Sequence, residues 1–132
     1  MRAVHRLRAS ADFERVRALK RFWSHSLLVL YTAPNEIGQV RLGVSVSRRI
    51  GKAVVRNRIR RRIREATHRF LRDLPCPEAA SADASARQGQ DLLFIARVRS
   101  GAASWDTLQT AVYDLLLRAQ QGSGRFLVPK GA

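Results

Sequence analysis

Residues 42–65 read LGVSVSRRIGKAVVRNRIRRRIRE and divide into a strand, a turn and a helix. Over residues 39–47, apolar residues alternate with small or polar ones, which predicts a strand with one buried face. Gly51 marks the turn. Over residues 52–73 the apolar residues recur at helical spacing, so we expect an amphipathic helix whose apolar stripe packs on the sheet. The buried face of the strand comprises Val40, Leu42, Val44 and Val46, and the helix stripe comprises Val55, Ile59, Ile63, Ala66 and Phe70.

The flanking sequence predicts two more helices and three more strands. A first helix is expected over residues 10–20, with a serine N-cap and acidic residues in its first turn. Strands are expected at residues 22–23, 27–32 and 91–98, and the last is apolar nearly throughout, which places it centrally in the sheet. Ser104 is expected to cap a final helix. The first helix has an apolar stripe of Phe13, Val16 and Leu19, and the final one a stripe of Trp105, Leu108, Val112, Leu115 and Leu116.

The element order is α-β-β-β-α-β-α, which predicts an α+β sandwich of helices on one four-stranded sheet. With 132 residues, of which 45% are hydrophobic, the chain is expected to form a single domain over residues 1–121. Residues 33–38 should form a hairpin-type loop. Residues 75–90 have few large apolar side chains and should form a mobile surface loop, and residues 122–132 a flexible tail.

Two features of the composition bear on the location of the protein. Cys76 is the single cysteine, which excludes an internal disulfide and fits a reducing cytoplasm. No apolar run approaches the roughly 20 residues that a membrane-spanning helix needs. The N-terminus also has no apolar segment of the secretory type behind its basic residues. We therefore expect a cytoplasmic protein with no membrane partner.

The charge of the chain is large and localised. Lys and Arg number 25 against 10 Asp and Glu, a formal charge of +15. Residues 37–64 contain no acidic residue and hold ten of the basic ones, nearly all of them arginine. Arginine binds phosphates through a planar fork and stacks on bases. This concentration predicts one face that binds a polyanion, and nucleic acid is the best candidate.

A solvated basic helix with no partner is the alternative interpretation of the arginine-rich stretch. Arg56, Arg60 and Arg64 are spaced four residues apart, and each like-charged pair destabilises a helix by about 0.2–0.5 kcal/mol. Only Glu65 lies close enough in sequence to offset them. A helix with this much repulsion is better explained by contact with a phosphate backbone.

Several short motifs occur together in a characteristic order. Asp12-Phe13 begins the first helix, VLYT ends the 27–32 strand, LGVSVSRR precedes the arginine-rich helix, and DLLFIAR forms the last strand. The arginine-rich helix itself contains Arg56-Asn57-Arg58. Over roughly residues 7–120, this combination resembles the protein component of bacterial ribonuclease P.

The resemblance implies an RNA-binding subunit of an endoribonuclease that removes the 5′ leader from precursor tRNA. Catalysis would reside in an RNA subunit and in Mg²⁺ ions bound mainly by that RNA, and the protein alone would not be catalytic. Its partners would be the catalytic RNA and precursor tRNA, with no organic cofactor and no stable protein partner. The resemblance also implies a left-handed β-α-β crossover, against the usual right-handed rule.

The resemblance assigns two sets of site residues. A cleft between the first helix and the sheet would bind the leader, and Arg97 fits such a polar cleft because an unpaired charge is costly to bury in an apolar strand. Family members often carry an aromatic residue where this chain has Arg17, so leader stacking is either weaker here or replaced by a phosphate contact. The residues implied for the catalytic RNA are Arg48, Lys52, Arg56, Asn57, Arg58, Arg60, Arg61 and Arg64, and those implied for the leader are Phe13, Arg17, Tyr31, Ser45, Arg49 and Arg97.

Other assignments remain open from the residues alone. Phe13 and Tyr31 could serve the core, the cleft or both. A ribosomal-type RNA-binding protein without an enzyme role, and a DNA-binding protein, are the alternative functions. The spacing of His5, His25 and His68 suggests no shared metal site, and no nucleophile–base set or pair of carboxylates suggests catalysis by the protein.

Overall fold

The computed structural model describes residues 5–6, 10–35, 40–73 and 89–123 and has the α+β architecture expected from the sequence. The predicted order of the helices and the longer strands is confirmed. The first strand was not predicted, and it has only two residues. The elements are β1 (His5–Arg6), α1 (Ser10–Ala18), β2 (Phe22–Ser24), β3 (Leu28–Asn35), β4 (Val40–Val46), the short 3-10 helix η1 (Arg48–Ile50), α2 (Ala53–Asp73), β5 (Gly89–Ala96), the 3-10 helix η3 (Val98–Ala102) and α4 (Trp105–Ser123).

The strands form one mixed sheet in the order β1-β4-β5-β3-β2. As expected, β5 is central: it runs antiparallel to β3 and parallel to β4. Because parallel neighbours need a crossover connection, α2 lies between β4 and β5 in the chain. The left hand of that crossover stays a prediction from the family resemblance.

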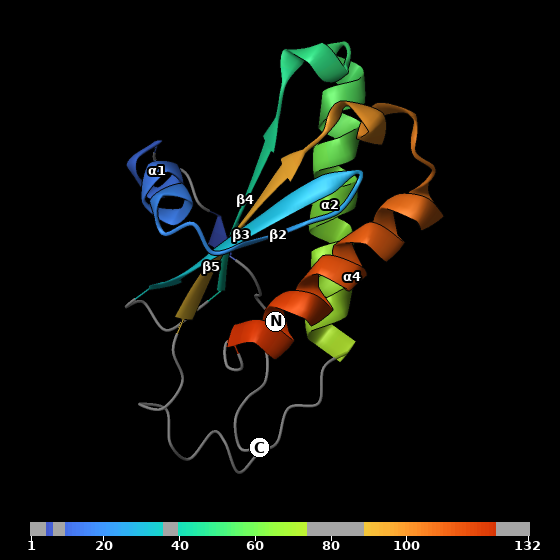
Figure 1. Cartoon of the computed structure of the whole chain (residues 1–132). Coiled ribbons are helices and arrows are strands. Elements are labelled where there is room, and N and C mark those ends of the chain that lie inside the picture. The colour runs from blue at the N-terminus through green and yellow to red at the C-terminus, as the bar shows by residue number, and fades with distance from the viewer. Residues whose placement is uncertain (1–4, 7–9, 36–39, 74–88, 124–132) are drawn as a thin grey trace.

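Helices cover both faces of the sheet (Figure 1). The larger core lies where α2 and α4 pack on one face, and it contains the predicted apolar stripes of both helices and the predicted buried face of β4. Ile59 is 2% exposed at the centre of the α2 stripe. The sheet face and the helix stripe expected from residues 42–65 therefore do pack together.

The opposite face carries α1 on a smaller apolar cluster. Val16, Ala33 and Leu93 are buried there, and Phe13 and Tyr31 pack against them. Leu19 was expected in this stripe, but that prediction is wrong. The helix ends at Ala18, and Lys20 adopts a left-handed backbone conformation (φ 57°) that turns the chain away and leaves Leu19 47% exposed.

Two expected loops begin or end elsewhere. Part of the loop expected at residues 33–38 belongs to β3, whose pairing with β5 continues to Asn35. Pro34 is tolerated there because β2 pairs only with residues 29–31, so the other edge of β3 is open at that point. In the same way, Gly89 and Gln90 belong to β5 rather than to the expected 75–90 loop. Residues 36–38 and 75–88 of these loops lie outside the described residues.

The ends of the last strand and helix also differ from expectation. The strand ends at Ala96 rather than Val98, and Val98 is exposed in η3. Ser104 caps α4 as predicted, because its Oγ accepts a hydrogen bond from the backbone N–H of Thr107 (3.2 Å). Helix α4 continues through Ser123, two residues into the expected 122–132 tail, and the remainder of that tail is outside the described part.

The two faces of α2 should respond differently to an added charge. Ile59→Asp should lower the free energy of unfolding by about 3 kcal/mol or more, because it buries an unpaired carboxylate in the larger core. Val54→Asp is the control, since Val54 is 71% exposed in the first turn of the same helix, where an acidic residue is favourable. Urea unfolding followed by circular dichroism measures both. Similar losses in the two variants would contradict this packing of α2.

Candidate nucleic-acid interface

The turn between β4 and α2 is fixed by local hydrogen bonds. Ser47 Oγ accepts from the backbone N–H of Arg49 (3.0 Å) at the start of η1. Gly51 follows with φ 155°, where a side chain would be strained, and its carbonyl accepts from Nε of Arg56 (3.1 Å). The turn thus holds Arg48, Arg49 and neighbouring Lys52 at the surface, while Arg56 also has a structural role.

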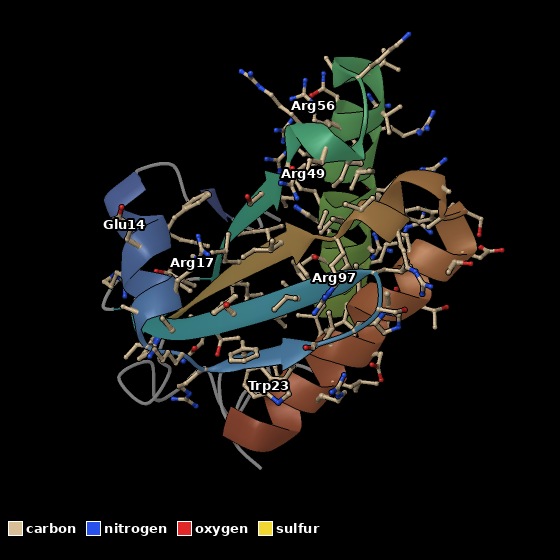
Figure 2. All side chains as sticks on the ribbon, turned by 45° about the horizontal axis from the view of Figure 1, so that its top comes forward. Glu14, Arg17, Trp23, Arg49, Arg56 and Arg97 are labelled. Carbon is tan, nitrogen blue, oxygen red and sulfur yellow. The ribbon has the colours of Figure 1, made fainter. Side chains whose placement is uncertain are left out.

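All eight residues expected to contact the catalytic RNA lie on this turn and on α2 as far as Arg64. The apolar stripe takes one side of the helix, so the arginines occupy the rest of its circumference. Figure 2 shows Arg49 and Arg56 at the same end of the molecule. The exposed residues are Arg48, Lys52, Asn57 and Arg61, and the partly buried ones are Arg56, Arg58, Arg60 and Arg64.

Local contacts shape the charge of this surface. Asn57 Oδ1 accepts a hydrogen bond from Nη1 of Arg60 (2.9 Å), so this motif residue orients an arginine as well as being exposed itself. The carboxylate of Glu65 pairs with Nε of Arg69 (2.9 Å), one turn toward the C-terminus. The one acidic residue of the region is therefore directed away from Arg58 and Arg61.

The residues expected to bind the leader lie on the α1 face of the sheet or at its margins, grouped around two surface hollows. Arg49 and Arg97 line a hollow of about 640 Å³ where β4 and β5 end (Figure 2). Arg17 and Tyr31 line a second, of about 480 Å³, beside the C-terminal end of α1. Ser45 of β4 pairs in register with Ile95 of β5 and lines neither hollow. Phe13 packs in the α1 cluster with Tyr31.

Arg97 occupies a different environment from the one assumed from the sequence. It was expected inside an apolar strand, but it follows the end of β5 and is exposed. Its backbone N–H donates to the carbonyl of Leu27 (2.9 Å), and its carbonyl accepts from Oγ of Ser100 (2.7 Å). Arg97 is therefore not a buried charge, and it lines the same hollow as Arg49.

The two arginine-bearing turns lie in contact. A Cβ atom added to Gly101 of η3 would lie 3.1 Å from the carbonyl oxygen of Ile50 and 3.2 Å from its Cγ2. Only glycine fits this approach without movement of η1 or η3. The contact brings Arg49, which precedes Ile50, close to the loop that follows Arg97.

Sequence reasoning missed a buried ionic cluster beneath α1. The carboxylate of Asp91 is fully buried and accepts hydrogen bonds from Nε and Nη2 of Arg41 (both 2.9 Å) and from Nδ2 of Asn35 (2.6 Å). Arg15 of α1 also pairs with this carboxylate. The sequence did contain a signal for this cluster, because Arg41 lies on the predicted polar face of β4 and Asp91 is the first residue of the predicted last strand. Their facing positions depend on the parallel register.

Comparison with known proteins identifies the family. Residues 1–120 match the family model described as Ribonuclease P. The chain belongs to the ribonuclease P protein family. It is 42% identical over 120 residues to the ribonuclease P protein component of Herpetosiphon aurantiacus, covering 91% of this chain and 88% of that one. The component from Roseiflexus castenholzii is 41% identical, covering 90% and 88% respectively.

Solved ribonuclease P proteins share the fold. The Staphylococcus aureus protein superposes with a TM-score of 0.69 at 29% identity, covering 89% of this chain and 97% of that chain. The Thermotoga maritima protein gives the same TM-score at 25% identity, covering 86% and 96%. The chain is accordingly an RNA-binding protein subunit of the endoribonuclease ribonuclease P, which acts in tRNA processing. The ribosomal-type and DNA-binding alternatives receive no support from these matches.

Two negative findings apply to the described residues. Within those ranges, no group of three or more His, Cys, Asp and Glu side chains is placed to hold a metal ion. No helix among them is long and apolar enough to cross a membrane.

The Asp91 cluster should contribute more to stability than a surface ion pair does. Asp91→Asn should lower the free energy of unfolding by about 2–4 kcal/mol, because Arg41 keeps its partly buried charge and loses its anionic partner. Amide hydrogen exchange in α1 should also accelerate, because Arg15 no longer anchors that helix.

The matched control is Asp114→Asn. Asp114 pairs with Arg118 (3.2 Å) on the exposed side of α4, and such pairs contribute at most about 0.5 kcal/mol. Urea unfolding at one salt concentration compares the two variants. Equal, small effects would show that the buried cluster does not hold α1 in place.

Proposed function

We propose that the subunit binds two RNAs through two surfaces: the catalytic RNA through η1 and α2, and the single-stranded 5′ leader of precursor tRNA along the α1 face. The first surface carries arginines on every side of α2 that the core leaves free. The second combines aromatic rings with arginines, on a sheet whose other face is occupied by the core. The observation that carries the proposal is this arrangement of Phe13, Tyr31, Arg49 and Arg97 on and around one face.

The chemistry of the α2 surface supports contact with a phosphate backbone. Arg58 and Arg61 lie outside the apolar stripe, and the neighbouring Glu65 is paired with Arg69. Guanidinium groups in such a setting bind phosphates bidentately and without regard to sequence. A structured RNA that brings several phosphates together would relieve the repulsion among these like charges.

The chemistry of the α1 face supports contact with an unpaired strand. An aromatic ring stacks on any base, which contributes roughly 1–3 kcal/mol per base and needs no particular leader sequence. Arg49 and Arg97, at the far end of β4 and β5, are suited to the phosphates of the same strand. A site of this kind favours precursor over mature tRNA, because the mature product has no leader, and it would therefore promote product release.

Catalysis would belong to the RNA partner in this scheme. Mg²⁺ prefers hard oxygen ligands and keeps several of its waters, and the phosphates of an RNA supply such oxygens in abundance. We assign the Mg²⁺ ions mainly to the catalytic RNA and give the protein the task of positioning substrate. We further propose that the complex acts in the cytoplasm, in keeping with the single cysteine.

Removing charge from α2 should weaken binding of the catalytic RNA. In the double variant Arg58→Ala/Arg61→Ala, the plot of log affinity against log salt concentration should become shallower by about 0.7–0.9 for each phosphate that the protein no longer neutralises. Filter binding at four salt concentrations measures this slope. Arg118→Ala on α4 removes an exposed arginine elsewhere and should leave the slope unchanged. If the double variant keeps the original slope, α2 does not contact the phosphates of the catalytic RNA, and this part of the proposal is wrong.

Removing an aromatic ring from the α1 face should affect precursor tRNA selectively. Tyr31→Ala should weaken holoenzyme binding of leader-bearing precursor by about 1 kcal/mol or more, while affinity for mature tRNA stays the same. Tyr113→Ala is the control, because Tyr113 is also partly buried but packs edge-on against Phe70 on the opposite face (centroids 5.3 Å apart). Equal losses for precursor and mature tRNA would mean that Tyr31 only supports the fold.

A further inference from the structure

The second hollow contains an aromatic side chain that the site residues above do not include. Phe22 lines it together with Tyr31, Arg17 and Lys20. The rings of Phe22 and Tyr31 lie 5.2 Å apart between centroids and are tilted by 30°. Phe22 is nevertheless 50% exposed, so the stack leaves a large part of its ring open to solvent.

Strand register explains why Phe22 lies on the α1 face. Phe22 pairs with Tyr31 across β2 and β3, and Tyr31 pairs in turn with Leu93 of β5. Cross-strand partners project on the same side of a sheet, and successive residues on opposite sides. Trp23 therefore packs against the larger core on the other face. The two aromatic residues of β2 therefore lie on opposite faces of the sheet: Trp23 packs against the core, and Phe22 is accessible to solvent.

Cationic side chains border the exposed ring. Arg17 comes from the last turn of α1, and Lys20 follows the end of that helix in its left-handed conformation. Both are exposed, and with Glu14 they give the rim of the hollow a net positive charge. An open aromatic face beside two cations is the combination that binds an unpaired nucleotide, through stacking of the base and contact with the phosphates.

We propose that Phe22 and Tyr31 form a base-stacking subsite for one nucleotide of the 5′ leader, with Arg17 and Lys20 at the adjacent phosphates. This subsite rests on the leader-binding function proposed above and extends it to the β2 edge of the sheet. The leader then follows the α1 face from the hollow at Arg49 and Arg97 to the ring of Phe22. Arg17 acts at a phosphate, and the aromatic surface beside it comes from β2.

Three substitutions at one position separate stacking from packing. Phe22→Leu keeps an apolar side chain without an aromatic face, Phe22→Tyr keeps the face, and Phe22→Ala removes both. In holoenzyme, Phe22→Leu and Phe22→Ala should bind leader-bearing precursor roughly fivefold or more weakly, and Phe22→Tyr should bind it normally. Affinity for mature tRNA should be unchanged in all three. Leu117→Ala, at a residue that is 47% exposed on α4, is the matched control for an exposed apolar side chain.

A position-specific readout locates the nucleotide. Precursors with a single 2-aminopurine at successive leader positions should show one position where emission is quenched by wild-type holoenzyme and recovers with Phe22→Leu. Thermal unfolding of each variant by circular dichroism should show little change, because Phe22 is half-exposed. Normal precursor affinity in Phe22→Leu, or quenching that this variant leaves intact, would overturn the subsite.

The subsite and the broader function fail in distinguishable ways. If Tyr31→Ala weakens precursor binding and Phe22→Leu does not, the leader follows the α1 face without reaching β2, and only the subsite is wrong. If neither variant changes precursor affinity, the leader does not bind this face, and the proposed function fails with the subsite.

Discussion

Asp91 joins α1, β3 and β4 through one carboxylate that lies in the central strand of the sheet. A buried charge costs several kcal/mol unless its lone pairs are satisfied, and Arg41, Asn35 and Arg15 together supply the donors. The apolar cluster beneath α1 is small, with Val16, Ala33 and Leu93 as its buried members. The position of α1, and with it one wall of the proposed leader site, therefore depends on electrostatics more than the rest of the fold does.

The other face of the sheet is held by a different force. There α2 and α4 bury a continuous apolar core that includes both helix stripes. Because that core needs only one side of α2, the remaining positions can carry arginine without loss of packing. The apolar core and the proposed RNA-binding surface thus use separate sides of the same helix, which is how a chain with a formal charge of +15 keeps a compact domain.

Features with a local period could be predicted from the sequence, and features that depend on register could not. The alternation in β4 and the helical stripe around Ile59 repeat within a few residues, so both were placed correctly. The extent of β3 past Pro34 depends on how far β5 pairs with it, and β1 depends on pairing with β4.

The same limit applies to the site. The Asp91 cluster and the stack of Phe22 on Tyr31 join residues that are distant in sequence or on separate strands, so strand pairing had to be known first. The arginines of α2 could be placed on the surface because any residue outside the stripe must face outward. The strand containing Arg97 was predicted two residues too long, because nothing in the local pattern marks the end of β5 at Ala96.

Gly101 affects the spacing of the two arginine-bearing turns, η1 and η3, although it carries no charge. At this glycine η3 closely approaches the carbonyl oxygen of Ile50, the residue that follows Arg49 in η1. Replacement by alanine would require η1 or η3 to shift by a few tenths of an ångström and would leave every cation in the sequence as it was. A substitution at this position would therefore change the spacing of the two arginine-bearing turns. A comparison of related sequences that is restricted to basic and aromatic residues would not detect it.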